Sequence, residues 1–243
     1  MNKNKIFGKV IITTIILISV NTFAYSYNNI VEIVNANSIL AEARDEYHAI
    51  EGPVELPDFE VFYKAFIGYK ELENKGIVES NILSIIDFSR HSSKKRFWII
   101  DMTSKKLLYY TYAAHGRNSG NGMGVASKFS NTPHSLQSSL GFYLTGETYY
   151  GKHGLSLNLD GQEKGINDKA RQRRVVIHGA DYATAEFAQR YGRLGRSYGC
   201  PAVPQHLHKP IINTIKDKSV LFIHHPDQHY QKSSEYMKKV VKI

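Results

Sequence analysis

Residues 174–179 read RVVIHG, and residues 196–201 read RSYGCP. The first stretch contains two valines and an isoleucine in a row, which is the apolar, β-branched composition of a buried strand. His178 is therefore expected to leave a sheet at the end of this strand. In the second stretch Cys200 lies between a glycine and a proline, where we expect a sharp turn that exposes the sulfur. The two stretches predict a β domain that brings a thiol and an imidazole together.

Cys200 is the only cysteine in the 243 residues. A thiol is a strong nucleophile only as the thiolate, so it needs a base that accepts its proton, and His178 is the candidate. The alternative is that a lone cysteine is simply a small buried hydrophobic residue. The adjacent glycine and the nearby serine favour a nucleophile.

The N-terminus is typical of an export signal, which we predict over residues 1–24. Lysines precede an apolar run at residues 10–20, and residues 22–24 have the small-residue spacing of a cleavage site. We therefore expect export to the periplasm or cell envelope, with an uncleaved anchor as the alternative. Exported proteins usually pair their cysteines, so a single one indicates an intermolecular bond or a reactive thiol.

The composition describes a folded protein that attracts anionic partners. Hydrophobic residues make up 42% and charged residues 22%, and the formal net charge is +9. Outside the cytoplasm this charge favours an anionic cell envelope, and no nucleic acid is expected because no helix-turn-helix or zinc-finger spacing occurs. No cofactor and no metal site are predicted. His224, His225 and His229 lack the spacing of a zinc site and are expected in a solvated tail.

Short apolar runs predict a mainly β or α+β domain over residues 82–226, after an N-terminal extension at 25–81 and before a basic tail at 227–243. The extension contains an amphipathic helix that begins after Asp58 and ends at Gly76. Further helices are expected at 182–191 and about 206–215. The expected strands are 82–88, 97–102, 106–112, 140–146, 155–159, 174–177 and 219–224. Such a series favours a sandwich or a half-open barrel.

The motifs around His178 and Cys200 resemble those of the YkuD-type L,D-transpeptidases, enzymes of bacterial cell-wall peptidoglycan. The shared features are a His-Gly at a strand end and a later Ser-x-Gly-Cys. The closer match is to a branch in which Pro-Ala-Val follows the cysteine, as at residues 201–203. Further motifs of the branch occur in the same order, namely AHGRNSG at 114–120, FSN at 129–131, YYGKHG at 149–154 and GIND at 165–168. The resemblance runs from about residue 82 to residue 226.

This resemblance implies a YkuD-like β-sandwich of mixed sheets with a few helices. It also implies acyl transfer through a thioester on Cys200, in which D-alanine leaves a peptidoglycan stem peptide and a neighbouring stem amine takes the acyl group. Other interpretations remain open. With water as acceptor the protein would be an L,D-carboxypeptidase or another cysteine peptidase that trims stem peptides, and without turnover it would be a cell-wall-binding module.

The resemblance also implies roles for individual residues. Cys200 is the nucleophile and His178 the general acid and base. Gly179 would orient the imidazole through its carbonyl, and the N–H groups of Gly199 and Cys200 would bind the oxyanion. Ser197 would bond within the loop or contact substrate. The expected substrate-binding residues are His115, Arg117, His153, Tyr198 and Arg196. Better-known members often have a histidine at the position of Tyr198 and an arginine or asparagine at that of Ala202, so the bracing of the loop is left open.

Overall fold

The computed structural model describes residues 35, 37–52 and 55–240, so the predicted export signal lies outside the described residues. The chain divides into two units, Met1–Glu42 and Ala43–Ile243. Residues 37–42 of the first unit are helical, and all the strands discussed below belong to the second. In the described part of the chain, no helix has both the length and the apolar character that a bilayer crossing requires.

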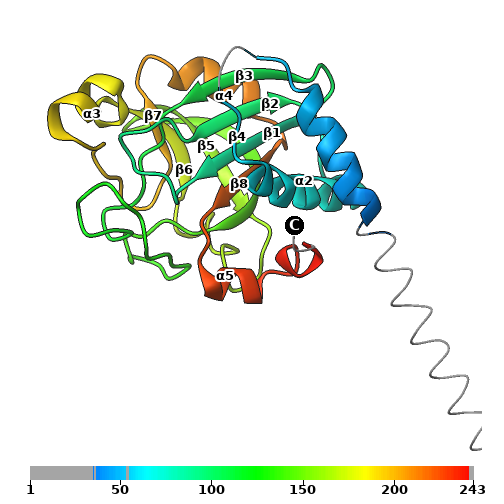
Figure 1. Cartoon of the computed structure of the whole chain (residues 1–243). Helices are drawn as coiled ribbons and strands as arrows, with labels where there is room; N and C mark the ends of the chain where they lie inside the picture. Colours follow the sequence, from blue (N-terminus) through cyan, green and yellow to red (C-terminus); the bar gives the residue numbers. More distant parts are fainter. Residues whose placement is uncertain (1–34, 36, 53–54, 241–243) are drawn as a thin grey trace, which may run out of the picture. The chain divides into compact units, whose positions relative to one another are not determined.

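The strands of the described residues form one mixed sheet in the order β3-β2-β1-β8-β4-β5-β6-β7 (Figure 1). They are β1 (Ile82–Asp87), β2 (Phe97–Asp101), β3 (Lys106–Thr111), β4 (Gly141–Gly151), β5 (Gly154–Gly161), β6 (Val176–Ala180), β7 (Ala202–Pro204) and β8 (Val220–His224). The mainly β prediction is confirmed. β7 was not expected, because three residues after a Gly-Cys-Pro turn are too short to show an alternating pattern.

The expected helices are also present. They are α2 (Phe59–Asn74), α3 (Ala185–Tyr191) after the 3-10 turn η1 (Asp181–Ala183), and α4 (His208–Ile215). Asp58 precedes α2 as predicted, but its side chain makes no capping hydrogen bond. α3 begins with a cap, because the Thr184 hydroxyl accepts a hydrogen bond from Phe187 N–H at 3.2 Å, and it ends at the left-handed Gly192.

The centre of the sheet is buried because helices cover it. α2 packs against β1 and β8, whereas α4 packs against β5, β6 and β1. β1 and β8 pair in parallel and are buried over almost their whole length. The helix α2 approaches the sheet closely at Gly68, where a Cβ would lie 2.1 Å from the ring of Phe142. This apolar packing fixes the strands that carry the site.

A segment after β3 links the two ends of the sheet. Ala114 N–H donates to the Ala202 carbonyl at 2.8 Å, and Ala202 N–H donates back at 3.3 Å. Farther along, Ser197 N–H donates to the His115 carbonyl at 3.0 Å, and Arg117 N–H donates to Ser197 at 2.7 Å. These bonds cover the edge of β7 and leave the sheet nearly closed.

The described part of the C-terminal tail is packed, which differs from the solvated tail expected from the sequence. Residues 227–240 form the helix α5 (Gln228–Ser233) and the 3-10 turn η2 (Met237–Lys239). Tyr230, Tyr236 and Met237 are buried. The cause is Glu163, whose carboxylate accepts hydrogen bonds from Tyr230 at 3.1 Å, from the Ser234 hydroxyl and from Phe142 N–H at 2.8 Å. A buried acceptor with several donors holds a polar segment that apolar periodicity does not reveal.

Two of the three histidines near this tail are not solvated, although the sequence predicted a solvated group. His224 lies in β8 with 4% of its surface exposed, and its Nδ1 atom has no hydrogen-bond partner among the described residues. The ring of His225 packs against Phe129 at 4.8 Å between centroids. His229 is exposed, as expected.

Burial of Glu163 makes stability depend on pH. Burial raises the pKa of its carboxyl above the ordinary value, although the bonds from Ser234, Phe142 and Tyr230 act in the opposite direction. The folded state therefore binds this proton more tightly than the unfolded state. The resulting stability is fully present below the ordinary carboxyl pKa and is lost as the pH rises through the folded pKa. In urea unfolding at several pH values, Glu163→Gln is expected to lack this part of the pH dependence.

Glu235→Gln is the matched control, because Glu235 is exposed and lies one residue beyond Ser234. It should keep the pH dependence of the wild type. Glu163→Ala should be less stable by about 3 kcal/mol, since it leaves several buried donors without an acceptor. Equal pH dependence in the wild type and Glu163→Gln would contradict this account.

Candidate active site

The pairing of β6 with β7 brings the two sequence motifs together. These strands are parallel, with His178 opposite Ala202 and Gly179 opposite Val203. Cys200 lies two residues before Ala202 and therefore falls beside Val176, whose N–H donates to the Cys200 sulfur at 3.5 Å. The nucleophile candidate thus lies just before β7, two residues along the register from His178 in the middle of β6.

The imidazole of His178 is held by its own strand. Its Nδ1 atom lies 2.9 Å from the carbonyl oxygen of Gly179. Donation from Nδ1 to this carbonyl leaves Nε2 with the lone pair, which is the form that accepts a proton. A side chain at Gly179 would collide with its surroundings, since a Cβ there would lie 2.4 Å from Gln205 and 2.7 Å from the ring of His208. The glycine therefore allows His208 to pack against β6.

A second histidine covers the imidazole of His178. The ring of His153, in the turn between β4 and β5, stacks on it with centroids 4.4 Å apart and an interplanar angle of 24°. His153 is exposed, whereas only 3% of the His178 surface is exposed. Burial lowers the pKa of His178, and the charges of His153 and His208 lower it further, while the bond to Gly179 acts in the opposite direction. This environment keeps the imidazole neutral and able to act as a base.

Removal of His153 is expected to shift the pH profile of the reaction. His153→Ala removes a like charge and opens the ring of His178 to water, so the pKa of His178 should rise toward its ordinary value. Activity is lost as His178 becomes protonated, so the acidic limb of kcat/KM against pH should move to higher pH. Activity below the ordinary histidine pKa should fall several-fold. His206→Ala, at an exposed site, is the control and should keep the profile of the wild type. An unshifted limb in His153→Ala would refute the role of the stacked ring.

The Cys200 thiol is partly exposed and bonds to the main chain. Besides accepting from Val176 N–H, it donates to the carbonyl of Arg174 at 3.5 Å. Among the described residues no hydrogen bond joins it to His178. Catalytic hydrogen bonds often form only with substrate in place, so this arrangement is compatible with proton transfer after a side-chain rotation. Burial raises the pKa of the thiol, whereas Val176 N–H and the charge of Arg173 act in the opposite direction.

Ser197 closes the loop that carries Cys200, residues 196–201, which is the candidate catalytic loop. The Ser197 hydroxyl donates to the Cys200 carbonyl at 2.6 Å and accepts from Gly199 N–H at 3.0 Å. Ser197 therefore bonds within the loop and is buried. Gly199 N–H was expected to bind the oxyanion, and in this structure it donates to Ser197 instead; its use as an oxyanion donor stays a prediction. Cys200 N–H is the other main-chain donor that the resemblance implies for the oxyanion.

A second layer of hydrogen bonds braces the same loop from outside. The Ser138 hydroxyl donates to the Gly199 carbonyl at 3.0 Å and accepts from Gly116 N–H at 3.0 Å. The Ser119 hydroxyl accepts from Ser138 N–H at 2.8 Å. Gly199 has φ of +126° and packs tightly, since a Cβ would lie 2.8 Å from the Gln137 carbonyl oxygen. Only glycine suits this position.

His115 was expected to contact substrate, and the structure corrects this prediction. It is 1% exposed, its Nδ1 atom accepts from Arg96 Nη2 at 2.8 Å, and its ring packs edge-on against Phe88. Burial and the charge of Arg96 lower its pKa to about 3. His115 is therefore a neutral core residue, and its main chain, not its side chain, supports the catalytic loop.

The other expected substrate-binding residues lie around the loop. Tyr198 is 71% exposed beside Cys200, and the guanidinium of Arg117 lies over its ring at 6.0 Å. Arg117 is exposed, and Arg196 Nη1 donates to its carbonyl at 3.2 Å. The structure therefore brings Tyr198, Arg117 and Arg196 together. Whether they bind substrate stays a prediction.

Sequence reasoning missed three residues of this region. His208 is buried behind Gly179, and its Nε2 atom has no partner among the described residues. Ser138 bonds to the Gly199 carbonyl, and Arg173 bonds to the neighbouring residue Gln137. A serine in a polar loop and one arginine of a basic run carry no local signal for such contacts. The motif at 114–120 could have indicated Gly116, but not its partner.

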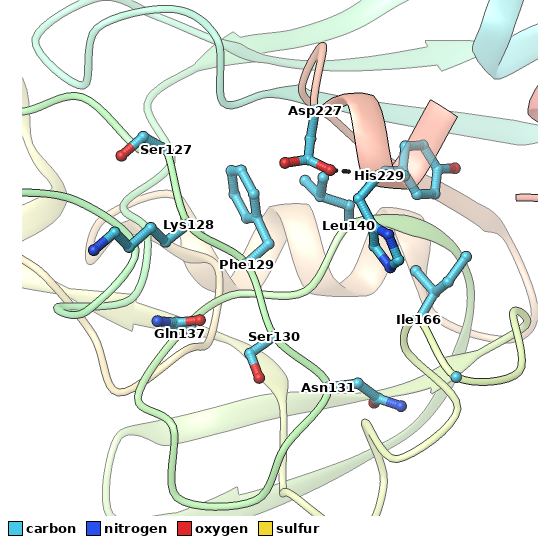
Figure 2. A pocket seen from close by; sticks show the side chains of 12 residues that line it. Ser127, Lys128, Phe129, Ser130, Asn131, Gln137, Leu140, Ile166, Asp227 and His229 are labelled. Carbon is cyan, nitrogen blue, oxygen red and sulfur yellow. Dashed lines mark hydrogen bonds between the residues drawn. The ribbon is translucent and has the colours of Figure 1, made fainter. Parts of the chain in front are cut away.

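A pocket of about 520 Å³ lies beside this loop, between segment 127–140 and the start of α5. Figure 2 shows Lys128 and Phe129 on the first segment and Asp227 and His229 on the second. Asp227 is occupied by capping α5, since it accepts from Tyr230 N–H at 2.8 Å. Neither Cys200 nor His178 lines the pocket. Its lining residue Gln137 nevertheless lies next to Gly199, where a Cβ would be 2.8 Å from the Gln137 carbonyl oxygen, so the pocket borders this loop.

The described residues contain no group of three or more His, Cys, Asp or Glu side chains placed to hold a metal ion. The chemistry that the region itself offers is that of a thiol, an imidazole with a free Nε2 atom and a main-chain donor. Together they can carry acyl transfer through a covalent intermediate.

One protein family matches most of this chain. The family model of the L,D-transpeptidase catalytic domain matches residues 55–224, which is more than half of the chain. The match begins before α2, so it includes the helix that the sequence assigned to the N-terminal extension. No curated protein matches the chain.

Solved structures of L,D-transpeptidases are similar at low sequence identity. The enzyme from Mycobacterium smegmatis is 10% identical, with 60% of this chain and 59% of that chain covered and a TM-score of 0.35. The enzyme from Mycobacterium tuberculosis H37Rv is 10% identical, with 60% and 58% covered and a TM-score of 0.35. The enzyme from Xylanimonas cellulosilytica DSM 15894 is 10% identical, with 77% and 93% covered and a TM-score of 0.33. This chain thus spans about three-fifths of the length of the two mycobacterial structures.

The domain match confirms the resemblance seen in the motifs around His178 and Cys200. This chain belongs to the L,D-transpeptidase catalytic-domain family.

Proposed function

We propose that the protein is a peptidoglycan L,D-transpeptidase that forms cross-links through a thioester on Cys200. The observation that carries the proposal is the parallel pairing of β6 with β7, which sets His178 opposite Ala202 and Cys200 beside Val176. Membership of the family supports it. A nucleophile, a neutral base and a main-chain donor have no purpose in a module that only binds.

In the first half-reaction, Nε2 of His178 accepts the thiol proton and the Cys200 sulfur bonds to the carbonyl carbon that precedes the terminal D-alanine of a stem tetrapeptide. The C–N bond to D-alanine then breaks, and His178 gives its proton to the leaving amine. The negative charge that develops on the carbonyl oxygen is stabilised by Cys200 N–H.

In the second half-reaction, an amine of a neighbouring stem peptide attacks the thioester. His178 accepts a proton from this amine, the C–S bond breaks and Cys200 leaves as the thiolate, which then regains the proton. The exposed Tyr198, with Arg117 and Arg196 beside it, offers an aromatic face and cations to the stem peptides. Arginine suits their carboxylates because its fork of donors matches the two oxygens.

We place this reaction outside the cytoplasm. The lysines and the apolar run at the N-terminus support export, and the formal charge of +9 favours the anionic cell envelope.

The test is to incubate the purified protein with disaccharide-tetrapeptide and to separate the products by chromatography and mass spectrometry. We expect release of D-alanine together with a cross-linked dimer, and a covalent acyl adduct on the intact protein. Tripeptide without dimer would mean that water is the acceptor and the protein is an L,D-carboxypeptidase. No product, with binding to sacculi retained, would mean a cell-wall-binding module.

A further inference from the structure

Arg173 lies next to the strand of His178 but has no place in the reaction just described. It is half-buried, and its guanidinium donates to segment 130–139 at several points. Nη1 donates to the carbonyl of Ser130 at 2.6 Å and to the hydroxyl of Ser139 at 3.2 Å. Nη2 donates to the carbonyl of Gln137 at 2.6 Å and to the hydroxyl of Ser135 at 3.3 Å. A half-buried cation that makes such a set of bonds holds its segment in one conformation.

The segment held by Arg173 is the one that packs on the catalytic loop. The carbonyl oxygen of Gln137 lies 2.8 Å from where a Cβ of Gly199 would be, and Arg173 Nη2 lies 3.5 Å from the same point. The next residue, Ser138, donates to the Gly199 carbonyl at 3.0 Å. Cys200 follows Gly199 directly in the chain, so the guanidinium lies close to the backbone that carries the thiol. Ala202, in the strand that follows, has no polar side chain to share this task.

We propose that Arg173 is the positioning residue of the catalytic loop: it clamps segment 130–139 against Gly199 and places a permanent positive charge near the Cys200 thiolate. The clamp keeps Cys200 N–H aimed at the position of the oxyanion. The charge favours the thiolate over the thiol, because an opposite charge nearby stabilises the ionised form. It opposes the effect of burial, which raises the pKa of the Cys200 thiol. This role rests on the proposed function of Cys200 as a nucleophile.

Two variants separate the clamp from the charge. Arg173→Gln keeps amide donors but removes the charge, whereas Arg173→Lys keeps the charge but loses the planar fork. Arg171→Gln is the matched control, since Arg171 lies two residues earlier, is exposed and bonds to Asp160 at 2.7 Å instead of the loop. Folding of each variant is checked by circular dichroism and by its denaturation midpoint.

The first readout is the rate of alkylation by iodoacetamide against pH, which reports the thiol pKa of a protein with one cysteine. Arg173→Gln should shift this titration upward by about one pH unit and slow alkylation at neutral pH roughly three- to tenfold. Arg173→Lys and Arg171→Gln should titrate like the wild type. An unshifted titration in Arg173→Gln would overturn the electrostatic part of the role.

The second readout is turnover with disaccharide-tetrapeptide. Arg173→Lys should lose about tenfold in kcat with little change in KM, because the loop loses its clamp while the charge remains. A kcat of Arg173→Lys equal to that of the wild type would overturn the clamp. This test of the clamp does not depend on Arg173→Gln, so it holds even if that variant does not fold. Alkylation needs no turnover, so the two proposals can fail separately. A shifted titration in Arg173→Gln with no cross-linking by the wild type would refute only the transpeptidase.

Discussion

Replacement of Cys200 by alanine is expected to lower the rate of cross-link formation at least about a thousandfold. The protein contains no other thiol that could form a thioester, because Cys200 is its only cysteine. The same variant should show no acyl adduct by intact mass and no alkylation by iodoacetamide. The measurement is D-alanine release and dimer formation from disaccharide-tetrapeptide.

The fold should survive this change. Within the described residues the thiol makes long hydrogen bonds of 3.5 Å, to Val176 and Arg174, and an alanine fits the space it leaves. Cys200→Ser is the matched variant, since it keeps a nucleophilic atom of lower reactivity and should leave only trace activity. Cross-linking by Cys200→Ala at a rate near that of the wild type would contradict the covalent mechanism.

Replacement of His178 by asparagine is expected to lower kcat by about 10²- to 10⁴-fold near neutral pH. An asparagine amide can still donate to the Gly179 carbonyl, which Nδ1 of His178 approaches at 2.9 Å, but it offers no Nε2 atom to take the thiol proton. The loss should therefore reflect the missing base and not a disturbed strand. Kinetics across a pH series tests this explanation.

The deficit in thioester formation should shrink as the pH rises, because the thiol then ionises without help from a base. His134→Asn is the control, since His134 is exposed and has φ of +62°, a conformation that asparagine tolerates. It should behave like the wild type. A deficit in His178→Asn that stays the same at every pH would show that His178 acts only by shaping the site.

Much of the fold followed from local patterns. The apolar run at 175–177 predicted a buried strand, and β6 (Val176–Ala180) is that strand; it continues beyond Ile177, so that His178 lies in its middle and not at its end as expected. The aromatic residues of α2 have helical spacing and predicted the helix, but its burial is not one-sided, since every residue from Val61 to Tyr69 is buried. Such elements are predictable because a β-branched run favours a strand and aromatic residues at spacings of three and four favour a helix.

Other parts could not be predicted because their partners lie far away in the sequence. β7 exists through its pairing with β6 and with the segment around Ala114, not through its own composition. The tail is packed because Tyr230 and Ser234 find the buried carboxylate of Glu163. A polar segment with a specific hydrogen-bond partner has the same composition as a solvated one.

The sequence by itself determined the reactive groups of this protein: one cysteine in a Gly-Cys-Pro turn and one histidine directly after an apolar run. The identity and order of the residues are enough to find these groups, because the reactivity of a thiol or an imidazole comes from the group itself. Only the tertiary structure decided how these groups are held. It buried His115 and stacked His153 on His178. In the folded chain Gly199 N–H donates to Ser197 within the loop, and the guanidinium of Arg173 lies near Gly199. These outcomes depend on contacts between distant segments, which no local pattern encodes.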